Sequence, residues 1–383
     1  MCLPADLVIP AADAAVLSEI SSWDGLRPAT FARAEFPVDV VRFEGSSSPP
    51  VVLSRSKRAE SLKALPATLR QRAEAAFERA ARQAPFLSLA HGRRLGLLPA
   101  PAVMGVLNVT PDSFSDGGLY FEKSRAVERG LAMLEEGAAV VDVGGESTRP
   151  ATYGEARQIS AAEETDRVVP VLEALRKATD APLSIDTRRA AVARAALAAG
   201  ADLVNDVSAL RHDPEMAETV SQASAGLLLM HMKGDDPRTM QEDVSYVHPL
   251  ADVASALAES ARRALEHGIP AGSIAIDPGL GFGKSGEGNL LLLRHLAALR
   301  ALGLPLALGA SRKAFVRRFS GVSESASAAE RLPGSLAAVA AAAQAGAALV
   351  RVHDVAETVR FLRMRRAIAE PTTQALREGA AAR

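Results

Sequence analysis

Two sets of polar residues in this sequence could form one ligand site. The first set consists of cationic or imidazole groups, whose donors suit phosphate oxygens: Arg149, Lys313, Arg351 and His353. The second set offers acceptors or mixed groups: Asp186, Asn205 and Asp277. A buried carboxylate that faces a flat N–H and NH2 edge accepts two parallel hydrogen bonds, as a guanidine-like heterocycle would supply. Together the two sets predict a site that holds a flat, donor-rich ring at one end and a phosphate at the other.

The same residues also have a structural interpretation. Strand ends are polar in general, and they often carry Asp or Asn as caps of the next helix. For Arg351 the structural alternative is an ion pair with a neighbouring carboxylate such as Asp354. Cationic and imidazole groups lie at the same ends of the predicted strands as isolated aspartates. This combination favours the ligand site over the structural alternative.

Short apolar runs that recur from about residue 102 must position these side chains. Each run ends in a polar loop, and an Ala-rich helix follows. We expect strands at 102–107, 139–143, 183–185, 203–204, 227–230, 273–276, 305–308 and 348–350, and helices near 124–136, 161–177, 190–199, 213–223, 249–267, 287–300, 330–344 and 355–367. Apolar strands without alternation are typical of a parallel sheet buried on both faces. Eight such units predict an α/β fold, the (β/α)8 TIM barrel, with its ligands at the C-terminal ends of the strands.

The first 98 residues differ from this pattern. The segment 36–43 alternates enough to predict a strand, and 57–82 predicts one or two helices broken at Pro66. We therefore expect a small α+β N-terminal extension at 1–98, a catalytic barrel at 99–371 and a flexible tail at 372–383.

Composition excludes several classes of function. The 383 residues include 44 Lys+Arg and 45 Asp+Glu, and this balance does not favour binding to nucleic acid or to an acidic membrane. One cysteine excludes an intramolecular disulfide framework and a cysteine zinc site. Because no basic segment precedes an apolar stretch at the N-terminus, we expect no signal peptide and a cytoplasmic location. Small-molecule substrates are the expected partners, and a homodimer is left open.

One glycine-rich motif does not support nucleotide binding. Residues 281–286 (GFGKSG) match G-x-G-x-x-G after a strand, but no acidic residue closes the next strand. The segment is not a Walker A loop either, because Pro278 occupies the position of its first glycine. The seven histidines never pair at metal-ligand spacing, which argues against a zinc site made by the protein.

The motifs as a group resemble those of dihydropteroate synthase, an enzyme family of the folate pathway. The matching segments are 104–118 (MGVLNVTPDSFSDGG), 142–150 (DVGGESTRP), 184–187 (SIDT), 204–207 (VNDV), 230–232 (MHM), 277–284 (DPGLGFGK), 311–313 (SRK), 331–335 (RLPGS) and 351–354 (RVHD). They occur in the order of the family and cover roughly residues 102–370.

The resemblance implies an activity and a set of site residues. The family joins 6-hydroxymethyl-7,8-dihydropterin pyrophosphate to p-aminobenzoate with Mg2+, releases pyrophosphate and is a target of sulfonamides. By position, the resemblance assigns the pterin to Asp186, Asn205, Asp277 and Lys313. It assigns the pyrophosphate to Asn108, Thr148, Arg149, Arg351 and His353, with Asn108 also near the metal. It assigns the p-aminobenzoate pocket to Phe114, Pro150, Phe282 and Lys313.

The chemistry that this implies is an SN1-like substitution. When pyrophosphate leaves, the carboxylates of Asp186 and Asp277 can stabilise the pterin-methylene cation. The expected catalytic residues are therefore Asp186, Asp277, Lys313, Arg351 and His353. No covalent enzyme intermediate is needed, and the sequence offers no Ser/His/Asp or Cys/His set for one.

The chain departs from the family pattern in three places, and two other functions remain as alternatives. Ala151-Thr152 replaces the usual Gly-Ala, Ala209 replaces a usual Gly, and Ala314 follows Lys313 where some members carry Ser. One alternative is a methyltransferase that uses methyltetrahydrofolate and a corrinoid protein, which would not need the loop at 108–114. The other is a non-catalytic pterin-binding or scaffold module whose extension binds a partner enzyme.

Overall fold

The computed structural model describes most of the barrel and parts of the region before it. The described residues are 6–11, 38–43, 51–54, isolated positions between 63 and 78, 84–99, 101–109, 119–146, 159–246, 249–323 and 325–369. The site residues Phe114, Thr148, Arg149 and Pro150 lie outside this set, as do most of the helical segment expected at 57–82, residues 151 and 152, and the tail at 372–383.

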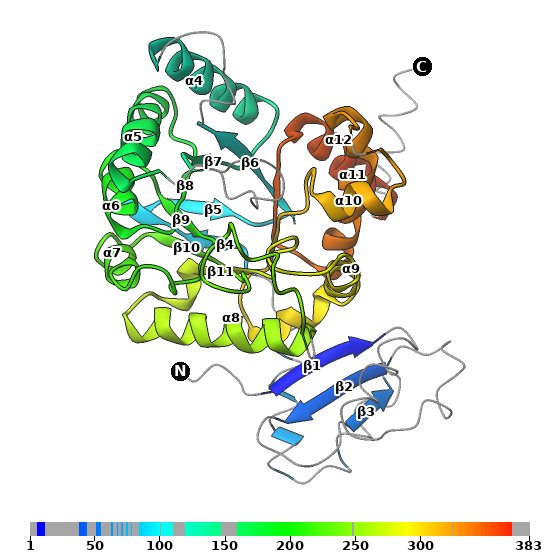
Figure 1. Ribbon diagram of the computed structural model, residues 1–383. Helices are drawn as coiled ribbons and strands as arrows, with labels where there is room; N and C mark the ends of the chain where they lie inside the picture. The colour runs from blue at the N-terminus through cyan, green and yellow to red at the C-terminus, as the bar shows by residue number, and fades with distance from the viewer. Residues whose placement is uncertain are drawn as a thin grey trace.

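Eight parallel strands form the barrel that the sequence predicts (Figure 1). In chain order they are β6 Ala102–Asn108, β7 Val140–Gly144, β8 Leu183–Asp186, β9 Leu203–Asp206, β10 Gly226–Met230, β11 Ile274–Asp277, β12 Ala307–Leu308 and β13 Leu349–Val352. The strand order is β11-β10-β9-β8-β7-β6-β13-β12, and a parallel bridge between Ile276 and Leu306 joins the two edges. The strands β7, β9, β10 and β11 are buried along their whole length, as expected for a sheet covered on both faces.

Helices surround the strands as a ring (Figure 1). They are α4 Leu119–Glu135, α5 Ala161–Ala178, α6 Ala190–Ala198, α7 Met216–Gln222, α8 Pro249–Glu266, α9 Gly286–Arg294, α10 Ala314–Phe319, α11 Ala328–Ala345 and α12 Val355–Ala369. Capping boxes begin two of them, because Ser160 and Ser327 each exchange hydrogen bonds with a glutamate three residues later. None of the described helices combines the length and apolar character that crossing a membrane requires.

Two helical predictions need correction. The single helix expected at 287–300 is α9, which ends at Arg294 with His295 as its C-cap, followed by a separate 3-10 helix, η7 Leu296–Leu302. The helices expected from the sequence also omit the short helix α10, which begins directly after Lys313.

A hairpin closes the N-terminal end of the barrel. Its strands are β4 Phe86–Ser88 and β5 Arg94–Gly96, and its leucines pack against the first residues of the barrel strands: Leu87, Leu89, Leu95 and Leu97 contact a layer that includes Met104, Leu203 and Leu349. The buried carboxylate of Asp202 accepts hydrogen bonds from Arg93 and Arg176 at 3.1 and 3.0 Å. Part of the range 1–98 therefore belongs to the barrel core, while the division of the chain at residue 98 stays a prediction.

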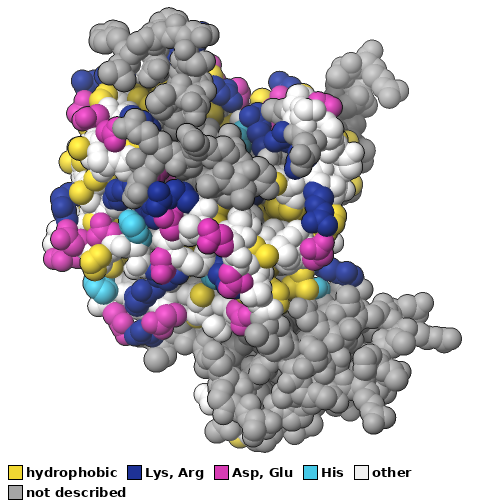
Figure 2. Space-filling model, in the orientation of Figure 1, with side chains coloured by type: hydrophobic (Ala, Val, Ile, Leu, Met, Phe, Trp, Pro, Cys, Tyr) yellow, Lys and Arg dark blue, Asp and Glu magenta, His cyan; other side chains and the backbone are white. Residues whose placement is uncertain are grey.

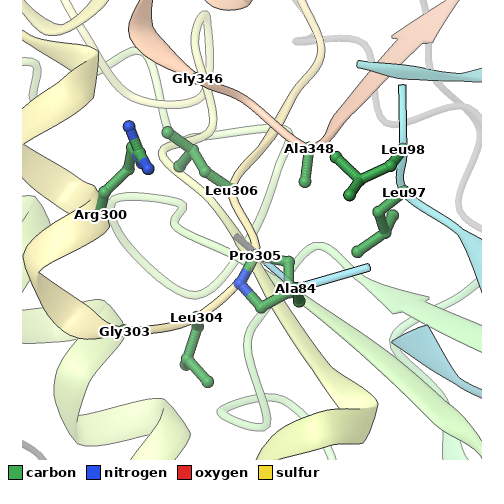
Figure 3. Close-up of a pocket in the computed structure, with 10 residues that line it drawn as sticks. All are labelled: Ala84, Leu97, Leu98, Arg300, Gly303, Leu304, Pro305, Leu306, Gly346 and Ala348. Carbon is green, nitrogen blue, oxygen red and sulfur yellow. The ribbon is translucent and has the colours of Figure 1, made fainter. Parts of the chain in front are cut away.

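A cavity of about 500 Å3 lies between this hairpin and the barrel (Figure 3). Leu97 and Leu98 line it from the hairpin, and Leu306 and Ala348 line it from the beginnings of β12 and β13. This cavity is at the opposite end of the barrel from the predicted site.

The upstream residues also contain a three-stranded antiparallel sheet. Its strands are β1 Asp6–Ala11, β2 Val38–Phe43 and β3 Val51–Ser54, with β2 in the centre. The strand expected at 36–43 is thus confirmed, and β1 contacts η7 of the barrel. Figure 2 shows Lys, Arg, Asp and Glu side chains interspersed over the visible face of the barrel, in line with the near-zero net charge.

Candidate active site

The C-terminal ends of the barrel strands bring four predicted site residues together. Asp186 ends β8, Asn205 lies in β9, Asp277 ends β11 and Arg351 lies in β13. Arg351 joins this group, because its Nη2 donates to Asp186 Oδ2 at 2.6 Å. Neighbouring strands in parallel register account for the arrangement, since Asp186 pairs with Asn205 directly.

A further carboxylate, which the sequence prediction missed, lies beneath this group. Asp142 in β7 is fully buried, and its Oδ2 accepts from Arg351 Nε at 2.6 Å and from Asn205 Nδ2 at 3.0 Å. Its other oxygen, Oδ1, has no hydrogen-bond partner among the described residues. Buried polar atoms nearly always have a partner, so this oxygen is available to a donor from a ligand or from water. The sequence signal was an aspartate inside an otherwise apolar strand, which is rare without a role.

The carboxylate of Asp186 is strongly influenced by its surroundings. Burial raises its pKa, and the Arg351 guanidinium only partly opposes this, while Asp142 raises the pKa further. Gly144 lies next to both side chains, because a Cβ at Gly144 would be in ordinary contact with Asp186 Cβ at 3.5 Å and with Asn108 Oδ1 at 3.8 Å. The end of β7 therefore lies between Asp186 and Asn108, and the exposed Asn108 side chain belongs to the same mouth.

Asp277 is held by backbone donors. Its Oδ1 accepts from the Gly279 N–H at 2.7 Å and its Oδ2 from the Gly309 N–H at 3.1 Å. Gly279 has a φ of +66°, and a Cβ there would lie 1.9 Å from the His231 carbonyl oxygen, so only glycine fits. Burial raises the pKa of Asp277, and nearby Lys313 opposes this.

Lys313 and Phe282, both expected at the p-aminobenzoate pocket, lie beside each other. The Lys313 ammonium is 4.6 Å from the centroid of the Phe282 ring, and it donates a hydrogen bond to the Leu280 carbonyl. Burial lowers the pKa of Lys313 to about 8, and Asp277 opposes this. The loop after β11 therefore links Asp277, which was expected at the pterin, to Phe282, which was expected at the p-aminobenzoate pocket.

Lys284 is a second residue that the prediction missed. It is 4% exposed, and its Nζ lies 2.9 Å from the carbonyl oxygens of Gly279 and Phe282 and 2.9 Å from His231 Nδ1. One ammonium thus holds the loop that carries Asp277 and Phe282 against the end of β10. Lys284 is the last residue of the motif at 277–284, so the sequence did mark its position. A lysine at that position gives no indication that it is buried.

We expect Lys284→Met to lower the free energy of unfolding and to weaken p-aminobenzoate binding. Methionine fills the space but leaves buried carbonyl oxygens without donors, which costs about 1–3 kcal/mol. Thermal unfolding and the KM for p-aminobenzoate measure the two effects. A variant with wild-type values of both would show that the loop keeps its shape without the ammonium.

The surroundings of Arg351 bear on the structural alternative considered for it. Arg351 does form ion pairs, but with Asp142 and Asp186 and not with Asp354. Asp354 is paired with Arg312, whose Nε lies 3.1 Å from its Oδ2. The ring of His353 lies beside Ser311, with 3.1 Å between Nδ1 and Oγ. The binding of phosphate by Arg351 and His353 stays a prediction.

One departure from the family pattern has a structural consequence. Ala209 has a φ of +51° and Leu210 a φ of +64°, in the left-handed region that favours glycine. Asp206 holds this turn, since its carboxylate accepts from the N–H groups of Ser208 and Leu210 at 2.8 and 2.7 Å. The chain therefore keeps the turn after β9 without the usual glycine.

The described residues fit a magnesium ion only when a phosphate accompanies it. They contain no cluster of three His, Cys, Asp or Glu side chains that could hold a metal. Mg2+ in phosphate sites commonly binds one or two protein oxygens, with waters and phosphate oxygens completing its shell. The amide oxygen of Asn108, exposed at the mouth, suits that pattern.

The barrel is similar to known proteins. Residues 104–353 match a family model described as pterin binding enzyme. The dihydropteroate synthase of Escherichia coli K12 is 42% identical over 267 residues, which cover 70% of this chain and 91% of that protein.

Solved structures agree with this similarity. The dihydropteroate synthase of Xanthomonas albilineans with 4-aminobenzoic acid superposes with a TM-score of 0.68 at 44% identity, covering 75% of this chain and 99% of that one. The same enzyme with 7,8-dihydropteroate gives a TM-score of 0.65 at 42% identity, covering 74% and 99%. The Yersinia pestis enzyme in a sulfonamide complex gives 0.67 at 41% identity, also covering 74% and 99%.

Proposed function

This chain belongs to the dihydropteroate synthases, within the family of pterin-binding enzymes, and on that basis we propose which of its residues bind each substrate. The reaction joins 6-hydroxymethyl-7,8-dihydropterin pyrophosphate to p-aminobenzoate and gives 7,8-dihydropteroate and pyrophosphate. Similarity to synthases over 70% of the chain favours this activity over the methyltransferase and over a scaffold without activity.

The pterin ring binds among the strand ends in this proposal. Asp186, Asn205 and Asp277 face its donor-rich edge, and Lys313 donates to its acceptors. The observation that carries the proposal is the connected group of Asp142, Asn205, Asp186 and Arg351, in which one oxygen of Asp142 still lacks a donor. A buried group of this kind is costly without a ligand that completes its hydrogen bonds.

Charge at the mouth assists the departure of pyrophosphate. Asp186 and Asp277 stabilise the positive charge that develops on the pterin methylene carbon. Arg351, His353 and Arg149 offset the negative charge on the leaving group, and Mg2+, held by Asn108 and the phosphates, would supply further charge neutralisation there. The amine of p-aminobenzoate then attacks from the pocket of Phe114, Pro150, Phe282 and Lys313, and loses a proton to water.

Turnover by the full chain tests the proposed function. With Mg2+ and both substrates, we expect one pyrophosphate released for each 7,8-dihydropteroate formed. Release of pyrophosphate that does not depend on p-aminobenzoate would indicate a hydrolase, and no release at all would favour a pterin-binding scaffold.

We expect the pterin pyrophosphate to bind before p-aminobenzoate. The proposed acceptor pocket includes Phe114 and Pro150, which follow β6 and β7 in the sequence, and enzymes often complete such a pocket only after a first ligand has bound. Calorimetry should detect p-aminobenzoate binding only after the protein has been mixed with Mg2+ and pyrophosphate or the pterin ester. Tight binding of p-aminobenzoate to the free protein would contradict this order.

The activity should pass through a maximum as the pH changes. The pKa of Asp186 is raised, so its carboxylate is lost as the pH falls from neutral, and the Lys313 ammonium is lost above about 8. We expect kcat/KM to fall on both sides, with apparent pKa values that belong to the coupled group. In Asp186→Asn the acidic limb should flatten; an unchanged acidic limb would assign it to another group.

The proposal also includes location and assembly. We place the enzyme in the cytoplasm, because its substrates are small soluble molecules. A homodimer is the assembly we would test first, because Met364 and Ile368 on α12 are 62% and 69% exposed. Light scattering of the wild-type protein and of a variant with both residues changed to Ser would test it.

A further inference from the structure

The cavity between the hairpin and the barrel is lined mainly by apolar residues. They are Ala84, Leu97, Leu98, Leu304, Pro305, Leu306 and Ala348, with Gly303 and Gly346 between them. The volume of about 500 Å3 lies within the range of roughly 300–1,000 Å3 that small-molecule sites occupy. Leu306 is buried, whereas Leu98 is 50% exposed, so the cavity reaches from the barrel to the surface of the hairpin.

One charged residue, Arg300 on η7, lines this cavity together with the apolar residues (Figure 3). Its guanidinium lies against Gly346, where a Cβ would be 2.7 Å from Arg300 Nη1, so a side chain at Gly346 would push it away. Arg300 is partly buried, and burial lowers its pKa; no carboxylate of the described chain opposes this. A cation beside apolar surface without a counter-charge is unfavourable unless a partner compensates it.

The structural alternative for Arg300 is an interaction with the end of α11. A helix C-terminus attracts a cation, and Gly346 is the C-cap of α11. Two carbonyl oxygens of the last turn, those of Ala342 and Ala343, already accept hydrogen bonds from the N–H groups of Ala347 and Gly346. The helix end therefore explains part of the position of Arg300, but it provides no full counter-charge.

We propose that this cavity is a second ligand site, which binds a small organic anion with one carboxylate on a hydrocarbon body. The carboxylate pairs with Arg300, because a guanidinium can donate two parallel hydrogen bonds to it. The hydrocarbon body lies among the leucines, where each methylene removed from water strengthens binding by about 3- to 4-fold. The site is at the opposite end of the barrel from the candidate active site, so this inference does not depend on the proposed function.

Calorimetry of the full chain with three related ligands tests both parts of the site. Octanoate is the probe, 1-octanol lacks its charge, and butanoate lacks four of its methylenes. We expect octanoate to bind about 10- to 100-fold more tightly than 1-octanol, because only the carboxylate forms charged hydrogen bonds with Arg300. It should bind about 100-fold more tightly than butanoate, because the shorter chain buries less apolar surface.

Two variants assign the binding to this cavity. Arg300→Gln should raise the Kd of octanoate about 10- to 100-fold and leave the Kd of 1-octanol within about three-fold of wild type. Arg194→Gln is the matched control, because it removes an exposed arginine that pairs with Glu215 on the outside of the barrel. If Arg300→Gln does not fold, Leu98→Asp replaces it: at a half-exposed position it places a negative charge beside the site, and it should weaken octanoate more than 1-octanol.

Three results would overturn the inference. No binding of octanoate at millimolar concentration would show that the cavity does not take such a ligand. A wild-type Kd for octanoate in both Arg300→Gln and Leu98→Asp would show that it binds elsewhere, for example at the cationic mouth of the barrel. A lower Tm of Arg300→Gln, with octanoate and 1-octanol weakened equally, would assign Arg300 to the end of α11 alone.

Discussion

Asp277→Asn and Asp186→Asn are each expected to lower kcat/KM by about 30- to 1,000-fold, which corresponds to about 2–4 kcal/mol of lost transition-state stabilisation. Each substitution keeps the size of the side chain and removes a negative charge beside the developing cation. In Asp277→Asn there is a further conflict, because both oxygens of Asp277 accept from backbone N–H groups, of Gly279 and Gly309. An amide can satisfy one of these donors and must direct its own NH2 at the other.

Asp180→Asn is the matched control for this experiment, since Asp180 is fully exposed and lies near the opposite end of the barrel. Steady-state rates with both substrates varied will separate kcat from KM. Near-wild-type kcat/KM in both Asp186→Asn and Asp277→Asn would place the pterin outside this group of strand ends.

Arg351→Met should have the largest effect on stability and also weaken ligand binding. Arg351 is the cation between two carboxylates, at 2.6 Å from each of Asp142 and Asp186. Removal of one partner from a buried ion pair costs about 3–5 kcal/mol, because the remaining charge is uncompensated. The Asp186 carboxyl would then have its pKa raised further, so the variant should lose stability progressively as the pH rises above the ordinary pKa of an aspartate.

The structure changes what Arg351→Met implies for the two ligands. A phosphate-facing arginine alone would leave the pterin contacts intact, but Arg351 donates directly to Asp186. We therefore expect weaker binding of the pterin alcohol as well, and a further loss of about 10-fold for the pyrophosphate ester if Arg351 also contacts phosphate. Among the described residues, the hydrogen bonds of Arg351 use its Nε and Nη2 groups. Its Nη1 group can therefore donate to a phosphate oxygen.

Melting curves at pH 5 and pH 8 and calorimetry with both ligands measure these effects. Adding Asp142→Asn to Arg351→Met should restore part of the stability, because it removes one of the two unpaired charges, but it should not restore turnover. Equal loss of both ligands would assign Arg351 to the pterin end alone, and an unchanged Tm would contradict the ion-pair account.

The sequence predicted the barrel well because its signal is repetitive. Each strand is a short apolar run, and the unit recurs eight times, so small errors at the ends of single runs do not change the count. The hairpin at 86–96 was not predicted, because strands of three residues carry no periodicity. Its leucines are explained only by the barrel end that they cover.

The part of the site that lies at strand ends could be predicted from the sequence. Asp186, Asp277 and Arg351 lie at or near strand ends, where polar side chains in a parallel barrel must converge. Asp142 and Lys284 act inside the protein, and each has a partner more than 50 residues away, Arg351 for Asp142 and His231 for Lys284. Ion-pair choice is equally non-local, which is why the structural alternative for Arg351 named its sequence neighbour Asp354, whereas two distant aspartates are its partners.

A crystal structure of the full chain with 6-hydroxymethyl-dihydropterin and pyrophosphate tests the central claim most directly. We predict that the donor-rich edge of the ring lies within hydrogen-bond distance of Asp186, Asn205 and Asp277, with pyrophosphate toward His353 and Asn108. A ring bound anywhere else, or bound at the strand ends with its donor edge turned away from these three side chains, would contradict the account.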